Sequence, residues 1–130
     1  MARDVGFDGI KRGALVTFKS ALVKGTDEDK LVKISANGTV ALCAEDENFI
    51  GVVRIIDDKD KAASVQIDGF TTMTYDSDHD PTVTDGQGWQ ALQAGSAATK
   101  VKPATEAVGV PLYKVVNVDS TNHLITFQLH

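Results

Sequence analysis

The fold class follows from one stretch of the chain, which reads Phe49-Ile-Gly-Val-Val-Arg-Ile-Ile56, Asp57-Asp-Lys-Asp-Lys61, Ala62-Ala-Ser-Val-Gln-Ile67, Asp68-Gly69 and Phe70-Thr-Thr-Met-Thr-Tyr75. Three runs rich in β-branched and aromatic residues are separated by a charged loop and by an Asp-Gly pair. β-branched and aromatic residues favour strands, and Asp-Gly favours a two-residue hairpin turn. The stretch therefore predicts a three-stranded antiparallel meander over residues 49–56, 62–67 and 70–75.

A second hairpin precedes this meander. Residues 31–35 and 39–43 are rich in Leu, Val and Ile and flank the pair Asn37-Gly38. Asn-Gly supplies the positive φ angles that a type I′ turn needs. We predict antiparallel strands joined at this pair, and hydrogen-bonded hairpin turns with positive φ at both Gly38 and Gly69.

Further strands are predicted outside the two hairpins. Residues 14–19, 89–92, 110–118 and 123–129 have strand character, and no window shows a helical period. The chain is therefore predicted to be all-β, a single small β-barrel or β-sandwich domain of about nine or ten short, mostly antiparallel strands with an N-terminal arm. Residues 1–25 form the arm and first strand in this prediction, and residues 26–130 form the barrel or sandwich. The alternation predicts one buried core containing Val52, Ile55, Val65, Ile67, Val116, Leu124 and Phe127.

Composition restricts the class of protein. The chain has 130 residues, 42% hydrophobic and 24% charged, which is typical of a folded globular domain. Its net charge of −5 argues against nucleic acid as a partner, because phosphates are bound by clustered Lys and Arg. No apolar run reaches the length of a membrane span, and Met1-Ala-Arg-Asp4 does not resemble a signal peptide. We therefore expect no membrane partner, and the single cysteine, Cys43, fits synthesis in a reducing cytoplasm.

The alternating carboxylates Asp76, Asp78 and Asp80, with His79 among them, are the sharpest candidate for a metal site. They do not fit a calcium-binding EF-hand loop, because Pro81 stands where glycine is needed. Gln87 likewise stands where a bidentate glutamate is needed. We expect these aspartates to be exposed and not to bind calcium tightly, and we assign no metal ligand and no cofactor.

No other motif points to catalysis. His79, His123 and His130 lack metal-binding spacing, and Gly86-Gln-Gly88 is too short a fragment for a phosphate-binding loop. The single cysteine, Cys43, lies in a strand pattern that favours a buried thiol over a nucleophile. Trp89 either fills the core or anchors a partner. We expect a protein that is not an enzyme, with no catalytic residue to name.

Five segments together resemble the small capsid decoration (cement) proteins of tailed phages. They are Ile34-Ser-Ala-Asn-Gly-Thr-Val-Ala-Leu-Cys-Ala44, Phe49-Ile-Gly-Val-Val53, Ala63-Ser-Val-Gln-Ile-Asp-Gly-Phe70, Val115-Val-Asn-Val-Asp119 and Leu124-Ile-Thr-Phe-Gln-Leu129. The resemblance lies in the order of a Gly-Val hairpin, a Gly-Val-Val strand, a strand ending in glycine and a Val-rich final hairpin. It covers roughly residues 30–130 and leaves the first 25 residues unmatched.

The resemblance implies a structural protein of the virion. Such proteins bind the outer surface of the major capsid protein shell, often as homotrimers, and stabilise the expanded head. The location it implies is the capsid exterior. The alternative that the residues leave open is a soluble β-barrel module that binds a carbohydrate or another small ligand.

The N-terminal arm is the predicted contact with the capsid. It has no core-forming period, yet it carries apolar side chains between glycines. An extended segment of this kind can lie along a partner surface or add to a sheet edge. The residues expected to contact the capsid are Arg3, Phe7, Ile10, Lys11 and Arg12. The other possibility is that the arm completes the sheet of its own domain.

Overall fold

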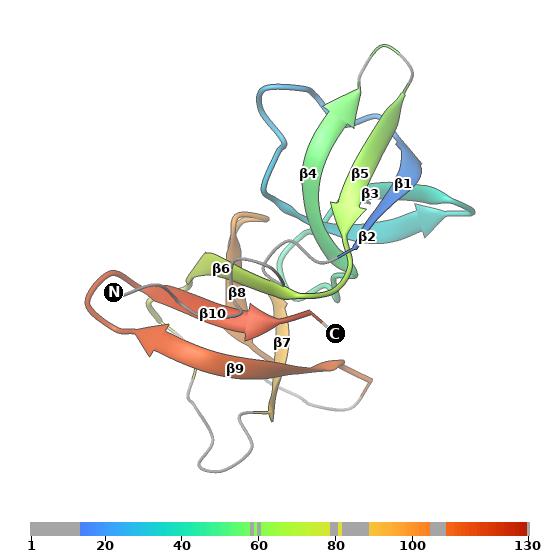
Figure 1. Ribbon diagram of the computed structural model, residues 1–130. Coiled ribbons are helices and arrows are strands. Elements are labelled where there is room, and N and C mark those ends of the chain that lie inside the picture. Colours follow the sequence, from blue (N-terminus) through green and yellow to red (C-terminus); the bar gives the residue numbers. More distant parts are fainter. Residues whose placement is uncertain are drawn as a thin grey trace.

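The computed structural model describes residues 14–57, 59, 61–78, 81, 89–104 and 109–129, and these residues form strands, turns and loops without a helix. Ten strands follow one another along the chain (Figure 1). They are β1 (Leu15–Ser20), β2 (Leu31–Ala36), β3 (Thr39–Leu42), β4 (Gly51–Asp57), β5 (Ala62–Gln66), β6 (Phe70–Tyr75), β7 (Trp89–Ala94), β8 (Lys100–Pro103), β9 (Leu112–Asp119) and β10 (Leu124–Gln128). The prediction of an all-β chain with about nine or ten strands is confirmed.

The ten strands close into two barrels (Figure 1). The first barrel has the strand order β1-β3-β2-β4-β5, and β1 pairs with β5 to close it. The second barrel has the order β10-β6-β8-β7-β9, and β10 pairs with β9 to close it. Strand β1, which we had grouped with the N-terminal arm, therefore belongs to the first barrel through its pairs with β3 and β5.

The second barrel repeats the first. When β6 to β10 are matched in order with β1 to β5, every neighbour is the same and every pair has the same sense. The only parallel pairs are β1 with β3 and β6 with β8 among the strands described. We call residues at matching ladder positions equivalent residues. The chain is thus built from two copies of one five-stranded barrel.

The repeat extends to single hydrogen bonds. The N–H of Ser20 donates to the carbonyl of Lys61 at 2.9 Å, and the N–H of the equivalent Tyr75 donates to His123 at 3.0 Å. Lys61 and His123 both have left-handed backbones, with φ of 56° and 54°. The following strand starts directly after each of them. The same local geometry therefore closes both barrels.

A β-bulge also occurs at the same place in both barrels. The β4–β5 ladder skips Arg54 between the pairs Val53–Val65 and Ile55–Ser64. The β9–β10 ladder skips one residue between Val115–Phe127 and Asn117–Thr126. Because a bulge adds one residue to one strand, it reverses which side chains face inwards beyond it.

The predicted meander is correct for its first two strands and wrong for the third. Strands β4 and β5 pair antiparallel, but β5 and β6 belong to different barrels. Asp68-Gly69 is therefore the connection between the barrels and not a hairpin turn. The positive φ predicted for Gly69 is present, at 79°. A hairpin and a connection between barrels both need a tight change of direction, and so they share this local signal.

The hairpin predicted at Asn37-Gly38 is present, since β2 and β3 pair up to Ala36 and Thr39. Gly38 has a φ of 63°, whereas Asn37 is not among the residues with positive φ, so the turn is not type I′. The ladder has an irregularity between Ile34 and Ala36 that accommodates this different turn. Strand β8 was not predicted, because it is only four residues long and ends in Pro103.

The hydrophobic interior consists of two clusters and not the one core that we predicted. Val65 lies in the first cluster, Val52 and Phe127 lie in the second, and all three are fully buried. Ile67, Val116 and Leu124 are only partly buried. Ile55 is 58% exposed, which contradicts its predicted place in the core.

Candidate functional site

Apolar packing and hydrogen bonds join the two barrels. Alternate residues of β2 and β4 face opposite ways: Val32 and Val53 fill the first barrel, while Leu31 and Val52 belong to the core cluster of the second barrel. Period-two alternation explains this division. The outer face of the first barrel thus covers the apolar interior of the second barrel, and we call this contact the inter-barrel joint.

Aromatic side chains pack at the centre of this joint. Phe49 precedes β4 and stacks on Tyr113 of β9, with ring centroids 4.7 Å apart and planes 14° apart. Its ring also meets Phe127 of β10 edge-on, at 6.0 Å. The hydroxyl of Tyr113 donates to the Phe49 carbonyl at 2.9 Å. Burial raises the pKa of Tyr113, so that its hydroxyl remains a donor.

Backbone hydrogen bonds fix the joint further. The N–H of Leu31 donates to Ala98 at 2.8 Å. The N–H of Asp46 donates to the carbonyl of Ala94 at 3.1 Å, and the N–H of Ala94 donates to Glu47 at 3.0 Å. Main-chain bonds of this kind need the two backbones to lie in register, so they hold one barrel at a defined angle to the other.

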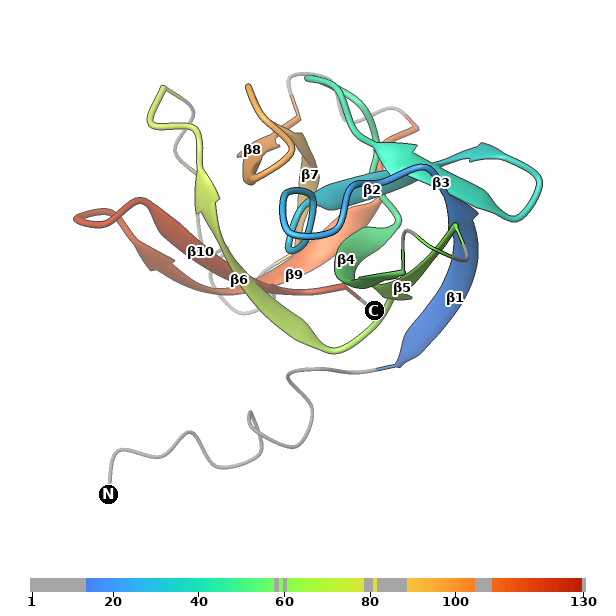
Figure 2. The same cartoon turned by 90° about the horizontal axis from the view of Figure 1, so that it is seen from above.

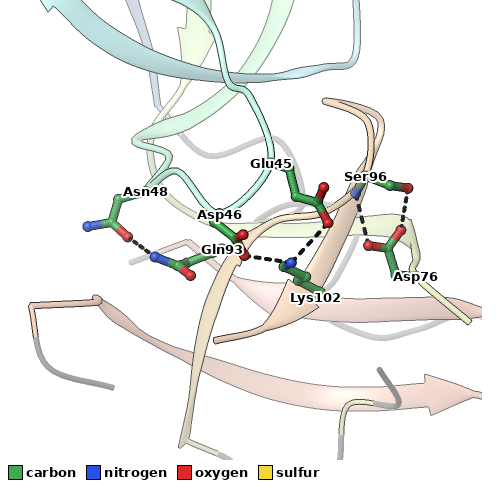
Figure 3. A network of polar contacts seen from close by, with 7 residues as sticks. All are labelled: Glu45, Asp46, Asn48, Asp76, Gln93, Ser96 and Lys102. Carbon is green, nitrogen blue, oxygen red and sulfur yellow. Dashed lines mark hydrogen bonds and ion pairs between the residues drawn. The ribbon is translucent and has the colours of Figure 1, made fainter. Parts of the chain in front are cut away.

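Lys102 on β8 forms an ion pair across the joint (Figure 3). Its ammonium lies 3.1 Å from a carboxylate oxygen of Glu45 and 2.5 Å from one of Asp46. Hydrogen bonding to Asp46 raises the pKa of Lys102 despite its burial. A lysine held in its charged form by two carboxylates is a structural cation and not a nucleophile.

Two further polar pairs lie beside this lysine (Figure 3). The amide of Gln93 donates to Asn48 Oδ1 at 2.9 Å, across the joint. Within the second barrel, Asp76 accepts from the N–H and the hydroxyl of Ser96, at 2.9 and 2.8 Å. These side chains bind one another, so their hydrogen-bonding capacity is used to hold loops in place.

Arg54, the bulge residue of β4, also links the barrels. Its guanidinium donates to Gln66 Oε1 at 2.9 Å, to Asp29 Oδ1 at 2.7 Å and to the hydroxyl of Thr71 on β6 at 2.9 Å. The bulge directs this side chain towards the connection between the barrels. The amide of Gln66 in turn donates to the carbonyls of Asp68 and Phe70. Arg54 and Gln66 therefore fix the chain where it passes from one barrel to the other.

The structure corrects one prediction about the acidic loop. Asp76 was expected to be exposed, yet it is 7% exposed and bound by Ser96. Gly95 explains the fit, since a Cβ there would come within 2.8 Å of the Asp76 carboxylate. Asp78 is exposed as predicted. His79 and Asp80 lie outside the described residues. The described residues contain no group of three metal-ligating side chains that could hold an ion.

Several other predicted residues also lie outside the described part of the chain. The proposed capsid contacts Arg3, Phe7, Ile10, Lys11 and Arg12 are among them, as are residues 82–88, His130 and the side chain of Trp89. These residues remain predictions from the sequence.

Cys43 is buried, as its strand pattern predicts. Desolvation raises the pKa of its thiol from 9.0 to about 12, with a smaller contribution from Glu47. The thiolate, which is the reactive form, is therefore disfavoured in the folded protein. Cys43 contributes to the joint as a small apolar side chain.

Exposed apolar side chains are the functional candidates that the sequence did not reveal. Among the described residues, five large apolar side chains are well exposed. They are Leu15, Val23, Ile34, Ile55 and Leu112, between 45% and 58% exposed. Isolated exposed apolar residues are common, so the position of each in the fold decides its meaning.

None of the described segments is a helix that could span a membrane. The described residues therefore present two packed barrels, a firmly bonded joint and a set of exposed apolar side chains. A scan of the chain against protein-family models finds no match, and a search of the curated proteins finds none either.

Proposed function

We propose that this protein is a capsid decoration protein that binds the outer surface of a major capsid protein shell and stabilises the expanded head. The observation that carries the proposal is the rigid joining of two side-chain-filled barrels, which leaves the outer surface and the N-terminal arm as the parts that can bind. The sequence resemblance to tailed-phage decoration proteins supports the same function.

The filled barrels argue against the alternative of a small-ligand module. A barrel of about eight strands is just wide enough to hold a small ligand, and these barrels have five strands each. Four valines, Val32, Val40, Val53 and Val65, fill the first barrel and are at most 2% exposed. A ligand would have to displace this packing.

The inter-barrel joint supports the proposal in a different way. A protein that holds shell subunits together must transmit force between its own parts without coming apart. The Phe49–Tyr113 stack, the Lys102 ion pair and the Arg54 bonds link the barrels at separate points. Such a body can present several contacts at fixed spacing, which gives avidity on a repetitive surface.

The arm remains the proposed main contact, through Arg3, Phe7, Ile10, Lys11 and Arg12. The carbonyl of Ala14 accepts from the N–H of Ile67 at 3.1 Å, so the first barrel's ladder begins at residue 14. A variant without residues 2–12 therefore keeps every described contact of the barrels.

The test is co-sedimentation of this variant and of the full chain with expanded, decoration-free heads of tailed phage, together with thermal melting of both. We expect the full chain to bind and the variant to bind far more weakly, with melting temperatures within a few degrees. Loss of folding in the variant would make the arm part of the core. Unchanged binding would place the contact elsewhere, and no binding by the full chain would contradict the function.

A further inference from the structure

The inter-barrel joint uses a different surface of each barrel. The first barrel contributes an outer face, with Leu31 and Val52 adjacent across the β2–β4 ladder. The second barrel contributes one open end, where Ala94 finishes β7 and Leu129 follows β10. Because the barrels are copies, each of them has both surfaces. Among the described residues, one outer face and one barrel end therefore have no such partner.

The unused outer face belongs to the second barrel. On the β7–β9 ladder Ala91 pairs with Leu112, as Leu31 pairs with Val52 in the first barrel. Leu31 and Val52 are fully buried in the joint, whereas Leu112 is 55% exposed and Ala91 is partly exposed. By the β2–β4 and β7–β9 ladders, Leu112 thus presents to solvent the position that the first barrel buries, whereas the β4–β5 and β9–β10 ladders match Val52 with the exposed Lys114, two residues further along the same face of β9.

The unused barrel end belongs to the first barrel. Ile34 is equivalent to Ala94, and Ile67 is equivalent to Leu129. Ala94 and Leu129 are at most 1% exposed, whereas Ile34 is 49% exposed and Ile67 is half-buried. Ile34 lies on the β2–β3 hairpin, which projects from the body of the molecule (Figure 2). This end thus carries isoleucines where the second barrel's covered end carries alanine and leucine.

The geometry points to a head-to-tail contact between copies of this chain, in which the Leu112 face of one copy covers the Ile34 end of the next. It repeats between molecules the contact that joins the two barrels within one molecule. Such a contact uses two different surfaces, so it builds a ring where its rotation closes and a filament where it does not.

The contact between copies is weaker than the joint. Ala41 occupies the position equivalent to Lys102, so the Lys102 ion pair with Glu45 and Asp46 has no counterpart there. The two barrels of one chain are also tethered, which raises their effective concentration, whereas separate copies must meet in solution. The association is therefore expected to be reversible and to depend on protein concentration. It does not depend on binding to a capsid.

Sedimentation velocity of the full chain over a wide concentration range tests this contact. We expect species larger than the 13.9 kDa monomer at high concentration. Ile34→Glu and Leu112→Glu should each weaken self-association by roughly tenfold or more, because each would bury a charge. Ile55→Glu is the matched control, since Ile55 is 58% exposed but lies outside both surfaces, and it should associate like the parent chain.

Mixing the two variants tests the head-to-tail arrangement. Ile34→Glu copies keep an intact Leu112 face and Leu112→Glu copies keep an intact Ile34 end, so an equal mixture should form dimers and nothing larger. A parent chain that stays monomeric at every concentration overturns the proposal. So does an Ile55→Glu variant that associates as poorly as the other two, or a Leu112→Glu variant that still associates by itself.

Discussion

Arg54 shows how one residue links local geometry to the whole fold. It is the extra residue of the β4 bulge, and its three hydrogen bonds reach Gln66, Asp29 and Thr71. The equivalent bulge residue in the second barrel is Val116, which is partly buried. The barrel fold therefore accepts a valine at this bulge, and the arginine is needed for the connection to the second barrel.

The first prediction uses this equivalence. Arg54→Val gives the first barrel the bulge residue of the second, and it should cost about 1–3 kcal/mol because the buried Gln66 oxygen loses its charged donor. Asp29→Asn removes only the charge of an exposed ion-pair partner, at a left-handed backbone position that asparagine also tolerates, and should cost less than about 1 kcal/mol. Urea unfolding measures both values. Equal losses would mean that Arg54 acts mainly through Asp29.

The second prediction concerns the thiol of Cys43. Its pKa of about 12 means that the folded protein should resist thiol-specific reagents at pH 8 and react fully in urea. The raised pKa also fixes the sign of its pH effect. Above pH 9.0 the unfolded thiol ionises while the folded one does not, so this group lowers stability as the pH rises from 9.0 towards 12. Rapid labelling of native protein would show that the joint opens.

At the scale of elements, the bulges decide which residues of a strand face inwards. Strict alternation from Val53 would place Ile55 inside and Ile56 outside. The bulge at Arg54 shifts the pattern by one residue, so Ile56 is 2% exposed and Ile55 is 58% exposed. The same shift in β9 leaves Asn117 exposed and packs the partly buried Val118 against the core.

The third prediction compares these two isoleucines. Ile56→Ala should cost about 2–5 kcal/mol, the usual range for removing a buried isoleucine side chain. Ile55→Ala should change stability by less than about 0.5 kcal/mol, because its side chain is largely in water already. Chemical denaturation of the two variants gives the comparison directly. A larger loss for Ile55→Ala would mean that the bulge lies elsewhere in β4.

At the scale of the molecule, the joint makes the two barrels one folding unit. Leu31, Cys43, Phe49 and Val52 come from the first half of the chain but belong to the core cluster of the second barrel. Separating the barrels would expose these side chains together with the end of the second barrel. The cost of that exposure couples the unfolding of one barrel to that of the other.

The fourth prediction follows from this coupling. Calorimetry should show one unfolding transition, with equal calorimetric and van't Hoff enthalpies. Phe49→Ala should lower that transition as a whole, at a cost of about 3–5 kcal/mol, because it removes the ring that stacks on Tyr113. Two separate transitions in the parent chain would show that the barrels fold independently.

Local sequence patterns were enough to predict much of the secondary structure. Nine of the ten strands overlap segments that were expected from β-branched residues and turn signals, and Gly38 and Gly69 have the predicted positive φ. These features depend on neighbouring residues, so a single sequence carries them. The burial of Cys43 was predictable for the same reason, because its strand pattern is local. The N-terminal arm could also be proposed as a contact from its composition.

Only the tertiary structure decided how the strands assemble. Closing the first barrel pairs Leu15 with Gln66, and no local pattern encodes a contact over that distance in the chain. The duplication was hidden for the same reason, since it lies in the ladders and few equivalent residues, such as Gln66 and Gln128, are identical. Asp76 is buried because Ser96 and Gly95 meet it in space. The exposure of Ile34 and Leu112 likewise has meaning only beside Ala94 and Val52, the buried residues at the matching places of the β7–β8 and β2–β4 ladders.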